Sequence, residues 1–267
     1  MLAVLAFFVG GSIGSFLNLA ADRMPAGRSI VSPRSFCESC NRHLASFDMV
    51  PVFSYLWLRG RCRYCRARIP LRFMVVEAFM GALFASIYFR HGFGAEFIVL
   101  GIAVSLLMVV ALIDLERGLI LNRIIYPSLV VLVLLAPFWT ELGLTRSFFG
   151  SESMVASLLN SIATGLGAFL VFLAIALAFP KGMGGGDIKL AGVIGLLAGF
   201  PGALIALWLG IVSGGLVAIG LLVFRKLGRK DTMPFGPFMA LGTIAALLAG
   251  GEIISWYQEV GDYVVRF

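Results

Sequence analysis

Charged side chains are scarce in this chain of 267 residues, because Asp, Glu, Lys and Arg together make up only 13% of it. Hydrophobic residues make up 60%, and the mean hydropathy is +0.99. A soluble domain of this length does not carry so much apolar surface, so the composition excludes that class. We therefore interpret the chain as a polytopic membrane protein.

Histidine and several catalytic motifs are also scarce. The chain has two His and no HExxH, which leaves no sign of a zinc metallopeptidase of that type. Its one GxSxG match, "GGSIG" at 10–14, lies inside an apolar run and not at the strand-to-helix turn that a serine hydrolase requires. The glycines of residues 182–186 are not followed by the Gly-Lys-Ser/Thr of a phosphate-binding loop. The first apolar run lacks a basic segment before it, so it is not a convincing signal peptide.

Long apolar runs are what the chain has in abundance. The sixth run is short, and it qualifies only as a tilted or partly buried helix. The predicted fold is all-α, a polytopic membrane helix bundle of about eight transmembrane helices. Their approximate ranges are 1–21, 73–90, 95–114, 124–141, 154–179, 187–199, 203–224 and 236–256.

Basic residues fall almost entirely in alternate loops. Of the 21 Lys and Arg, 18 lie in the segments 22–72, 115–123, 180–189 and 225–233. The positive-inside rule places these segments in the cytoplasm and both termini outside. The alternation supports the count of eight spans, because removing one span would scramble it. We therefore read the net charge of +7 as topology, with the lipid bilayer and not nucleic acid as the partner.

The one large loop is residues 22–72, which is too short to build a good hydrophobic core. It contains "CESC" at 37–40 and "CRYC" at 62–65. Two such pairs predict a structural zinc site, since four thiolates close a tetrahedron around the ion. The alternative is two disulfides, which the expected cytoplasmic location disfavours. The predicted ligands are Cys37, Cys40, Cys62 and Cys65.

Two aspartates lie at the cytoplasmic ends of predicted spans. Asp114 lies in the last turns of the third span and Asp187 at the start of the sixth, so topology places them at one membrane depth. Two close carboxylates do not both ionise easily, which gives the acid and base needed to activate water against a peptide carbonyl. The alternatives are a helix N-cap for Asp187 and a solvated helix end, beside Glu116 and Arg117, for Asp114.

Several segments resemble a known family. "GMGGGDIKL" contains G-x-G-D at 184–187 and resembles the motif of the GxGD membrane aspartyl proteases. Five further segments resemble the bacterial prepilin peptidases of type IV pilus and type II secretion systems, in the expected order over nearly the whole chain. They are "GSFLNLAADRMP" (14–25), "PRSFCESC" (33–40), "RGRCRYC" (59–65), "DLERGLILN" (114–122) and "MPFGPFMALG" (233–242).

The resemblance implies an enzyme of the bacterial inner membrane. Such enzymes cut the basic leader from prepilins and pseudopilins at the cytoplasmic face, then N-methylate the new N-terminal residue with S-adenosylmethionine. It implies that Asp114 and Asp187 are the catalytic pair and that the four Cys bind zinc. The expected domains are a first transmembrane helix (1–21), a cysteine domain associated with methyl transfer (22–72) and a peptidase domain (73–267).

Glu77, Asn18 and Arg23 lie near the same cytoplasmic level. One interpretation, which depends on the resemblance, is a role in methyl transfer, with Glu77 holding the substrate amine. The other is structural, with Glu77 as the buried partner of an Arg of the cysteine domain. The glycines of "GGSIG" (10–14) are better explained by helix packing than by a cofactor loop.

Two other functions remain open at this point. One is a peptidase of the same family that does not methylate, which the retained cysteine domain disfavours. The other is a transporter or channel that uses the membrane acids as a proton or cation relay. Broken helices near the midplane and repeated halves are typical of transporters, whereas here the acids lie at one rim and the sequence has no convincing repeat.

Overall fold

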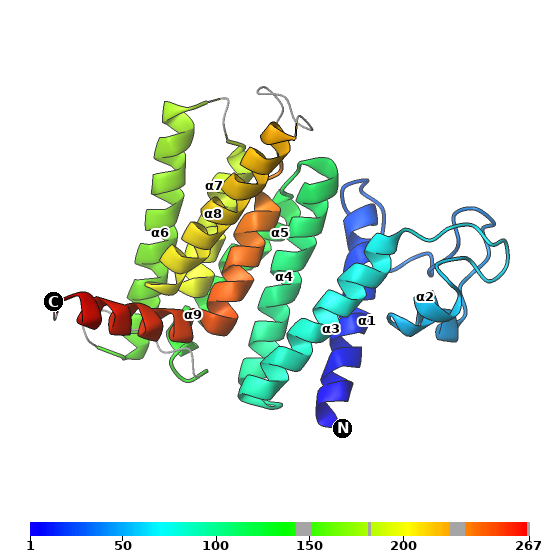
Figure 1. The fold of residues 1–267 in the computed structure, drawn as a ribbon, viewed down its shortest axis with the longest axis horizontal. Coiled ribbons are helices and arrows are strands. Elements are labelled where there is room, and N and C mark those ends of the chain that lie inside the picture. Colours follow the sequence, from blue (N-terminus) through cyan, green and yellow to red (C-terminus); the bar gives the residue numbers. More distant parts are fainter. Residues whose placement is uncertain (143–150, 181–182, 225–232, 266–267) are drawn as a thin grey trace. The chain divides into compact units, whose positions relative to one another are not determined.

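The computed structural model describes residues 1–142, 151–180, 183–224 and 233–265 (Figure 1). These residues form helices and two isolated β-bridges and no strand, which confirms the predicted all-α fold. The chain divides into two compact units, Met1–Ile113 and Asp114–Phe267.

Helices are present at all eight predicted ranges. A short helix, α2 (Phe53–Trp57), and two 3-10 turns, η1 (Ser46–Met49) and η2 (Ala136–Phe138), accompany them. The eight helices are α1 (Leu2–Arg23), α3 (Leu71–His91), α4 (Ala95–Arg117), α5 (Asn122–Leu135), α6 (Met154–Ala178), α7 (Gly185–Ala198), α8 (Gly202–Val223) and α9 (Gly236–Val265).

Six of these helices are long and apolar enough to cross a membrane: α1, α3, α4, α6, α8 and the Gly236–Ile253 part of α9. The chain is therefore a multi-pass membrane protein. Helices α5 and α7 have 14 residues each, which is about 21 Å at 1.5 Å per residue. That is less than the roughly 30 Å of a hydrocarbon core, so a crossing by α5 or α7 stays a prediction.

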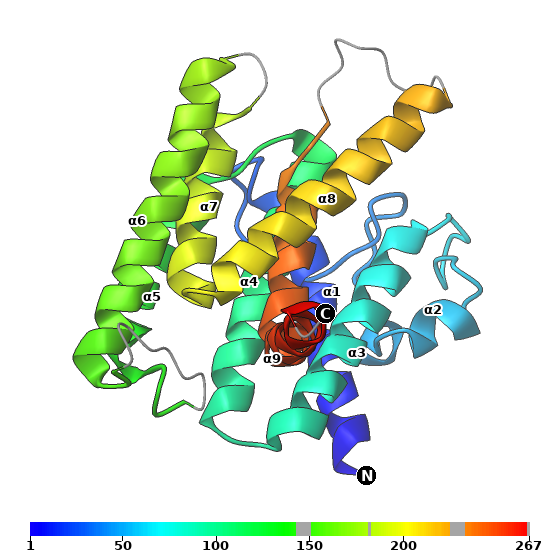
Figure 2. The same ribbon diagram turned by 60° about the vertical axis from the view of Figure 1, so that its left-hand side comes forward.

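In the first unit, α1 and α3 pack side by side and antiparallel (Figures 1 and 2). Glycines of α1 allow the close approach: a Cβ at Gly10 would meet the Met80 carbonyl oxygen and the Phe84 ring. A Cβ at Gly14 would lie 3.0 Å from the Val76 carbonyl oxygen. These contacts confirm that "GGSIG" serves helix packing.

In the second unit, α7 packs on α6, and α8 packs on α9. A Cβ at Gly195 of α7 would lie 2.6 Å from the Gly165 Cα of α6, so the two backbones touch there. Every residue of α7 from Leu190 to Leu197 is buried. The expectation of a partly buried sixth helix is thus confirmed, and this helix carries Asp187 in its first turn.

Candidate functional site

The two Cys-x-x-Cys loops of the first unit share one backbone conformation. In each, the N–H of the first cysteine donates to the carbonyl of the residue five positions on, and the residue four positions on donates back to the cysteine carbonyl. That fourth residue, Asn41 in one loop and Arg66 in the other, has a φ of +54° or +60°. The pair of loops thus presents Cys37 and Cys62 in equivalent places.

The four cysteine sulfurs gather in one cluster. All four are free thiols, and their Sγ atoms lie within 4.8 Å of one another. The Sγ atoms of Cys37 and Cys65 are 3.8 Å apart, the edge of a tetrahedron with Zn–S bonds of about 2.3 Å. The donor set and spacing therefore fit a structural zinc ion, and the disulfide alternative is not what the structure contains.

The thiols of this cluster hold their protons unequally. Desolvation opposes ionisation of Cys37, but hydrogen bonds from backbone N–H groups and from neighbouring thiols outweigh it and lower the pKa of Cys37 to about 7. The Ala67 backbone N–H favours the thiolate of the exposed Cys65, but partial desolvation and hydrogen bonds with the other three thiols outweigh it and raise the pKa of Cys65 to about 11. A divalent cation would favour the thiolate form of all four, because a thiol that coordinates a metal gives up its proton.

In the second unit, both predicted aspartates accept hydrogen bonds at helix starts. Asp114 is buried, with 5% of the residue exposed. Its Oδ2 accepts a hydrogen bond from the Gly236 N–H of α9 at 2.8 Å. Asp187 is half-buried and accepts at Oδ2 from the Gly184 N–H at 3.2 Å. The first N–H groups of a helix have no intrahelical partner, and the helix dipole favours an anion there.

The two aspartates lie close enough for their charges to interact, so the structure brings the predicted pair together. The predicted helix start needs a correction. Helix α7 begins at Gly185 with Gly184 as its N-cap, so Asp187 is the third helical residue and not the cap. Its carboxylate still reaches back to the N-cap N–H, so Asp187 caps the helix from inside the first turn.

Glycines set the space around these carboxylates. A Cβ at Gly236 would lie 2.7 Å from the Asp114 Oδ2, and a Cβ at Gly186 would lie 2.7 Å from the Ile120 Cβ. Sequence reasoning quoted the segment around Gly236 but gave this residue no role. A glycine at a predicted helix start was the available signal, since only a missing side chain lets a carboxylate approach so closely.

The partners of the Lys189 side chain differ from the partner of Asp187. Its Nζ donates to the Asn122 Oδ1 at 2.8 Å and lies 5.4 Å from the centre of the Tyr126 ring. Both partners belong to α5, so Lys189 ties α5 to α7 about half a turn after the aspartate. Sequence reasoning used this lysine only as a marker of topology.

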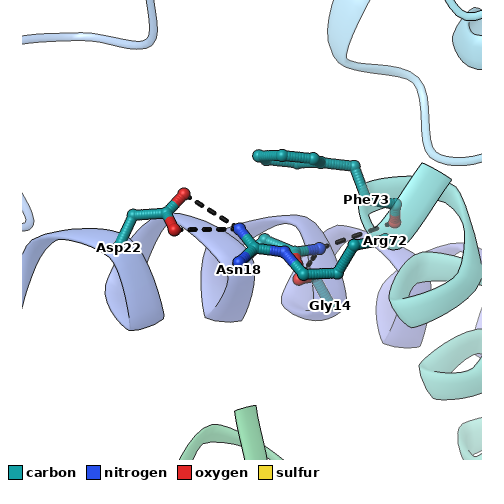
Figure 3. A network of polar contacts seen from close by, with 5 residues as sticks. All are labelled: Gly14, Asn18, Asp22, Arg72 and Phe73. Atoms are coloured by element: carbon teal, nitrogen blue, oxygen red, sulfur yellow. Dashed lines mark hydrogen bonds and ion pairs between the residues drawn. The ribbon is translucent and has the colours of Figure 1, made fainter. Parts of the chain in front are cut away.

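Asn18 lies in the interface between α1 and α3 (Figure 3). Asn18 is fully buried. Its side-chain Nδ2 donates to the Gly14 carbonyl at 3.2 Å and to the Phe73 carbonyl at 3.5 Å. The Asn18 Oδ1 is buried and has no hydrogen-bond partner among the residues that the structure describes. Beside it, Arg72 holds both oxygens of Asp22 at 2.9 and 3.0 Å, which joins the ends of the two helices.

Arg23 and Glu77 also contact their own unit. The Arg23 Nη1 donates to the carbonyls of Ser29 and Pro33 at 3.1 and 2.9 Å. The buried Glu77 accepts at Oε2 from the Val52 N–H at 2.8 Å. The structural hypothesis for Glu77 predicts a partner in the cysteine domain, and Val52 lies in that domain. The donor is a backbone N–H, however, and not the predicted Arg.

The chain is similar to known proteins over most of its length. Residues 8–91 match the Bacterial Peptidase A24 N-terminal domain, and residues 101–219 match the Type IV leader peptidase family. A "Prepilin leader peptidase/N-methyltransferase" of Bacillus subtilis (strain 168) is 35% identical over 260 residues, covering 97% of this chain and 99% of that protein.

Proteins of the same name from Pseudomonas putida and Aeromonas hydrophila are 31% and 28% identical to this chain. The alignments cover 93% and 95% of this chain, and 91% and 92% of those proteins. No solved structure matches the chain. The similarity at this level confirms the expected family and enzyme class, and the chain belongs to the prepilin leader peptidase/N-methyltransferase family.

Proposed function

We propose that this enzyme cleaves the basic leader of type IV prepilins or pseudopilins at the cytoplasmic face of the bacterial inner membrane. It then N-methylates the new N-terminal residue with S-adenosylmethionine. The names of the relatives support both activities. The observation that carries the peptidase assignment is the pair Asp114 and Asp187, which lie in one unit with interacting charges.

The two carboxylates divide the chemistry of peptide hydrolysis. Two close carboxylates share one proton, because their charges repel. The ionised member takes a proton from water, and the protonated member polarises the scissile carbonyl. Backbone N–H groups hold the Oδ2 of each aspartate, so we assign the reaction to the Oδ1 atoms. The pair titrates as a unit, so the roles are not assigned to individual residues.

The cytoplasmic orientation rests on the distribution of basic residues in the sequence. Five of those residues, Lys181, Arg225, Lys226, Arg229 and Lys230, lie outside the described residues. A substrate with a basic leader and an apolar helix would lie with that helix in the bilayer. Its leader junction would then reach the membrane rim, where we place the aspartates.

The described contacts support the zinc part of this proposal but outline no binding site for S-adenosylmethionine. The four cysteines fit zinc, which would hold the two Cys-x-x-Cys loops together. The contacts of Glu77, Asn18 and Arg23 outline no site for S-adenosylmethionine, since each side chain contacts separate atoms of the first unit. We therefore derive no step through this cofactor, and a methyl-transfer role for these residues stays a hypothesis.

The first prediction concerns the aspartates. Asp114→Asn and Asp187→Asn each keep the size and an acceptor oxygen but remove the ionisable group, so leader cleavage should fall about 10²–10⁴-fold. The measurement is cleavage of a membrane-embedded prepilin by purified, folded enzyme. Glu116→Gln, which changes an exposed acid near Asp114, is the matched control and should keep the native rate. Near-native cleavage by folded Asp187→Asn would contradict the catalytic role and leave Asp187 with helix capping alone.

The second prediction concerns Gly236. A methyl group at this position would push on the Asp114 carboxylate, so Gly236→Ala should slow cleavage roughly 100-fold, as expected for a catalytic group displaced by about 1 Å. The control is Gly215→Ala in α8, where a Cβ has no described neighbour within 4 Å. If both variants cleave prepilin equally fast, the contact between Gly236 and Asp114 does not matter to the reaction.

The third prediction concerns the metal. Purified enzyme should contain about one zinc ion per chain. Cys62→Ser should lower the zinc content, loosen residues 22–72 towards limited proteolysis and impair methylation more than cleavage. Ser39→Ala, an exposed change between Cys37 and Cys40, should retain the metal. Metal-free enzyme with both cysteine pairs oxidised would contradict the assignment.

The fourth prediction separates the two activities. Glu77→Gln keeps an oxygen that accepts from the Val52 N–H but removes the ionisable group. Methylation of a cleaved pilin should fall, while most leader cleavage should remain because both aspartates belong to the other unit. Mass spectrometry of the pilin N-terminus reports both reactions. An equal loss of both in a folded protein would assign Glu77 to the fold.

A further inference from the structure

One part of the loop between α1 and α3 is unlike the rest in composition. Residues 44–58, here called the apolar segment, contain one charged residue, Asp48. The Asp48 side chain is only 2% exposed and forms an ion pair with Arg63 at 2.7 Å. Residues 59–72 then contain six Arg. A segment with one neutralised charge is therefore followed by a strongly basic one.

The apolar segment exposes large side chains. Trp57 is 84% exposed, and five others are between 37% and 59% exposed. So many neighbouring apolar side chains indicate a surface that meets something other than water. The six residues are Phe47, Met49, Val50, Phe53, Leu56 and Trp57.

The apolar segment also contacts the flank of the α1–α3 pair. A Cβ at Gly11 would lie 2.8 Å from the Pro51 Cβ, and the Phe53 ring stacks on Phe8 with 5.7 Å between centroids. Between these contacts, the Val52 N–H donates to Glu77. Figures 1 and 2 show α2 beside this pair of helices and not beyond its end.

The position of these contacts along α1 and α3 gives their depth. From Leu2 to Asp22, α1 is about 30 Å long, which equals the thickness of a hydrocarbon core. The Asp22–Arg72 ion pair therefore marks one boundary of that core. Gly11 lies about 17 Å from Asp22 along α1, and Glu77 lies about 8 Å from Arg72 along α3. The apolar segment thus contacts the helices well inside that boundary.

The backbone around α2 has internal partners of the kind that lipid demands. Irregular backbone at membrane depth needs internal partners for its polar groups. Val52 is the centre of a γ-turn, a rare and strained conformation, with φ +64° and ψ −50°. Its N–H has the Glu77 carboxylate as partner, while the N–H groups of Phe53, Ser54, Leu56 and Leu58 donate to carbonyls of the same segment.

We propose that the apolar segment 44–58 is embedded in the bilayer beside α1 and α3. Its exposed apolar side chains contact lipid acyl chains, as those of an interfacial helix do. Four exposed arginines of residues 59–72 lie at headgroup level, where they pair with lipid phosphates: Arg59, Arg61, Arg66 and Arg68. The bilayer is the occupant that fits best, because the surface is uncharged at acyl depth and cationic beside it. The cysteine cluster is consequently anchored at the membrane surface.

Quenching of Trp57 fluorescence in proteoliposomes tests this placement. Trp57→Phe is a mild change, so the difference between native and variant emission isolates Trp57 from the other three tryptophans. Lipids with brominated acyl chains should reduce the Trp57 emission about twofold or more, because embedded apolar side chains touch those chains. Aqueous acrylamide should leave it nearly unchanged.

A matched probe on the cysteine cluster serves as control. Tyr64→Trp in the Trp57→Phe protein places a tryptophan between Cys62 and Cys65, where Tyr64 is 41% exposed. This probe should be quenched by acrylamide and not by lipids brominated deep in the chain. Zinc content and leader cleavage verify that each variant is folded.

Two results would overturn the proposal. Quenching of Trp57 by acrylamide alone would place the apolar segment in water. Protection of Trp57 from both quenchers would mean that protein covers it, whether another part of this chain, a second copy or the substrate.

Discussion

A carboxylate among apolar membrane helices needs a hydrogen-bond donor, and in this enzyme the donors are backbone N–H groups. Gly236 supplies one to Asp114, and Gly184 supplies one to Asp187. In the other unit, the N–H of the γ-turn donates to Glu77. Each of these hydrogen bonds has two effects. It satisfies a backbone N–H that lipid cannot satisfy, and it fixes the position of the carboxylate.

Missing side chains make this arrangement possible. Gly236 lets a helix start touch the Asp114 carboxylate, and Gly10 and Gly14 let α1 approach the backbone of α3. In a membrane, helix association depends on close packing and hydrogen bonds and not on the hydrophobic effect, so small residues carry much of it. The glycines therefore connect the packing of each unit to the placement of its polar groups.

Much of the fold follows from apolar runs, and the cysteine cluster follows from the spacing of its two pairs. Topology pairs Asp114 with Asp187, and the resemblance to the family implies the same pair. The bond from Gly236 to Asp114 joins residues 122 positions apart, so no local pattern predicts it. The exposed apolar face of residues 44–58 was missed because the segment, 15 residues long, is too short to register as a span. It was therefore grouped with the cytoplasmic loop around it.

The central claim is that Asp114 and Asp187 act as one catalytic unit. The most direct measurement is the rate of prepilin cleavage by the double variant Asp114→Asn/Asp187→Asn, beside each single variant. Catalytic groups that act together are strongly non-additive, so the double variant should be about as slow as the slower single variant. Losses that multiply in the double variant would show two independent contributions and contradict the shared-proton account.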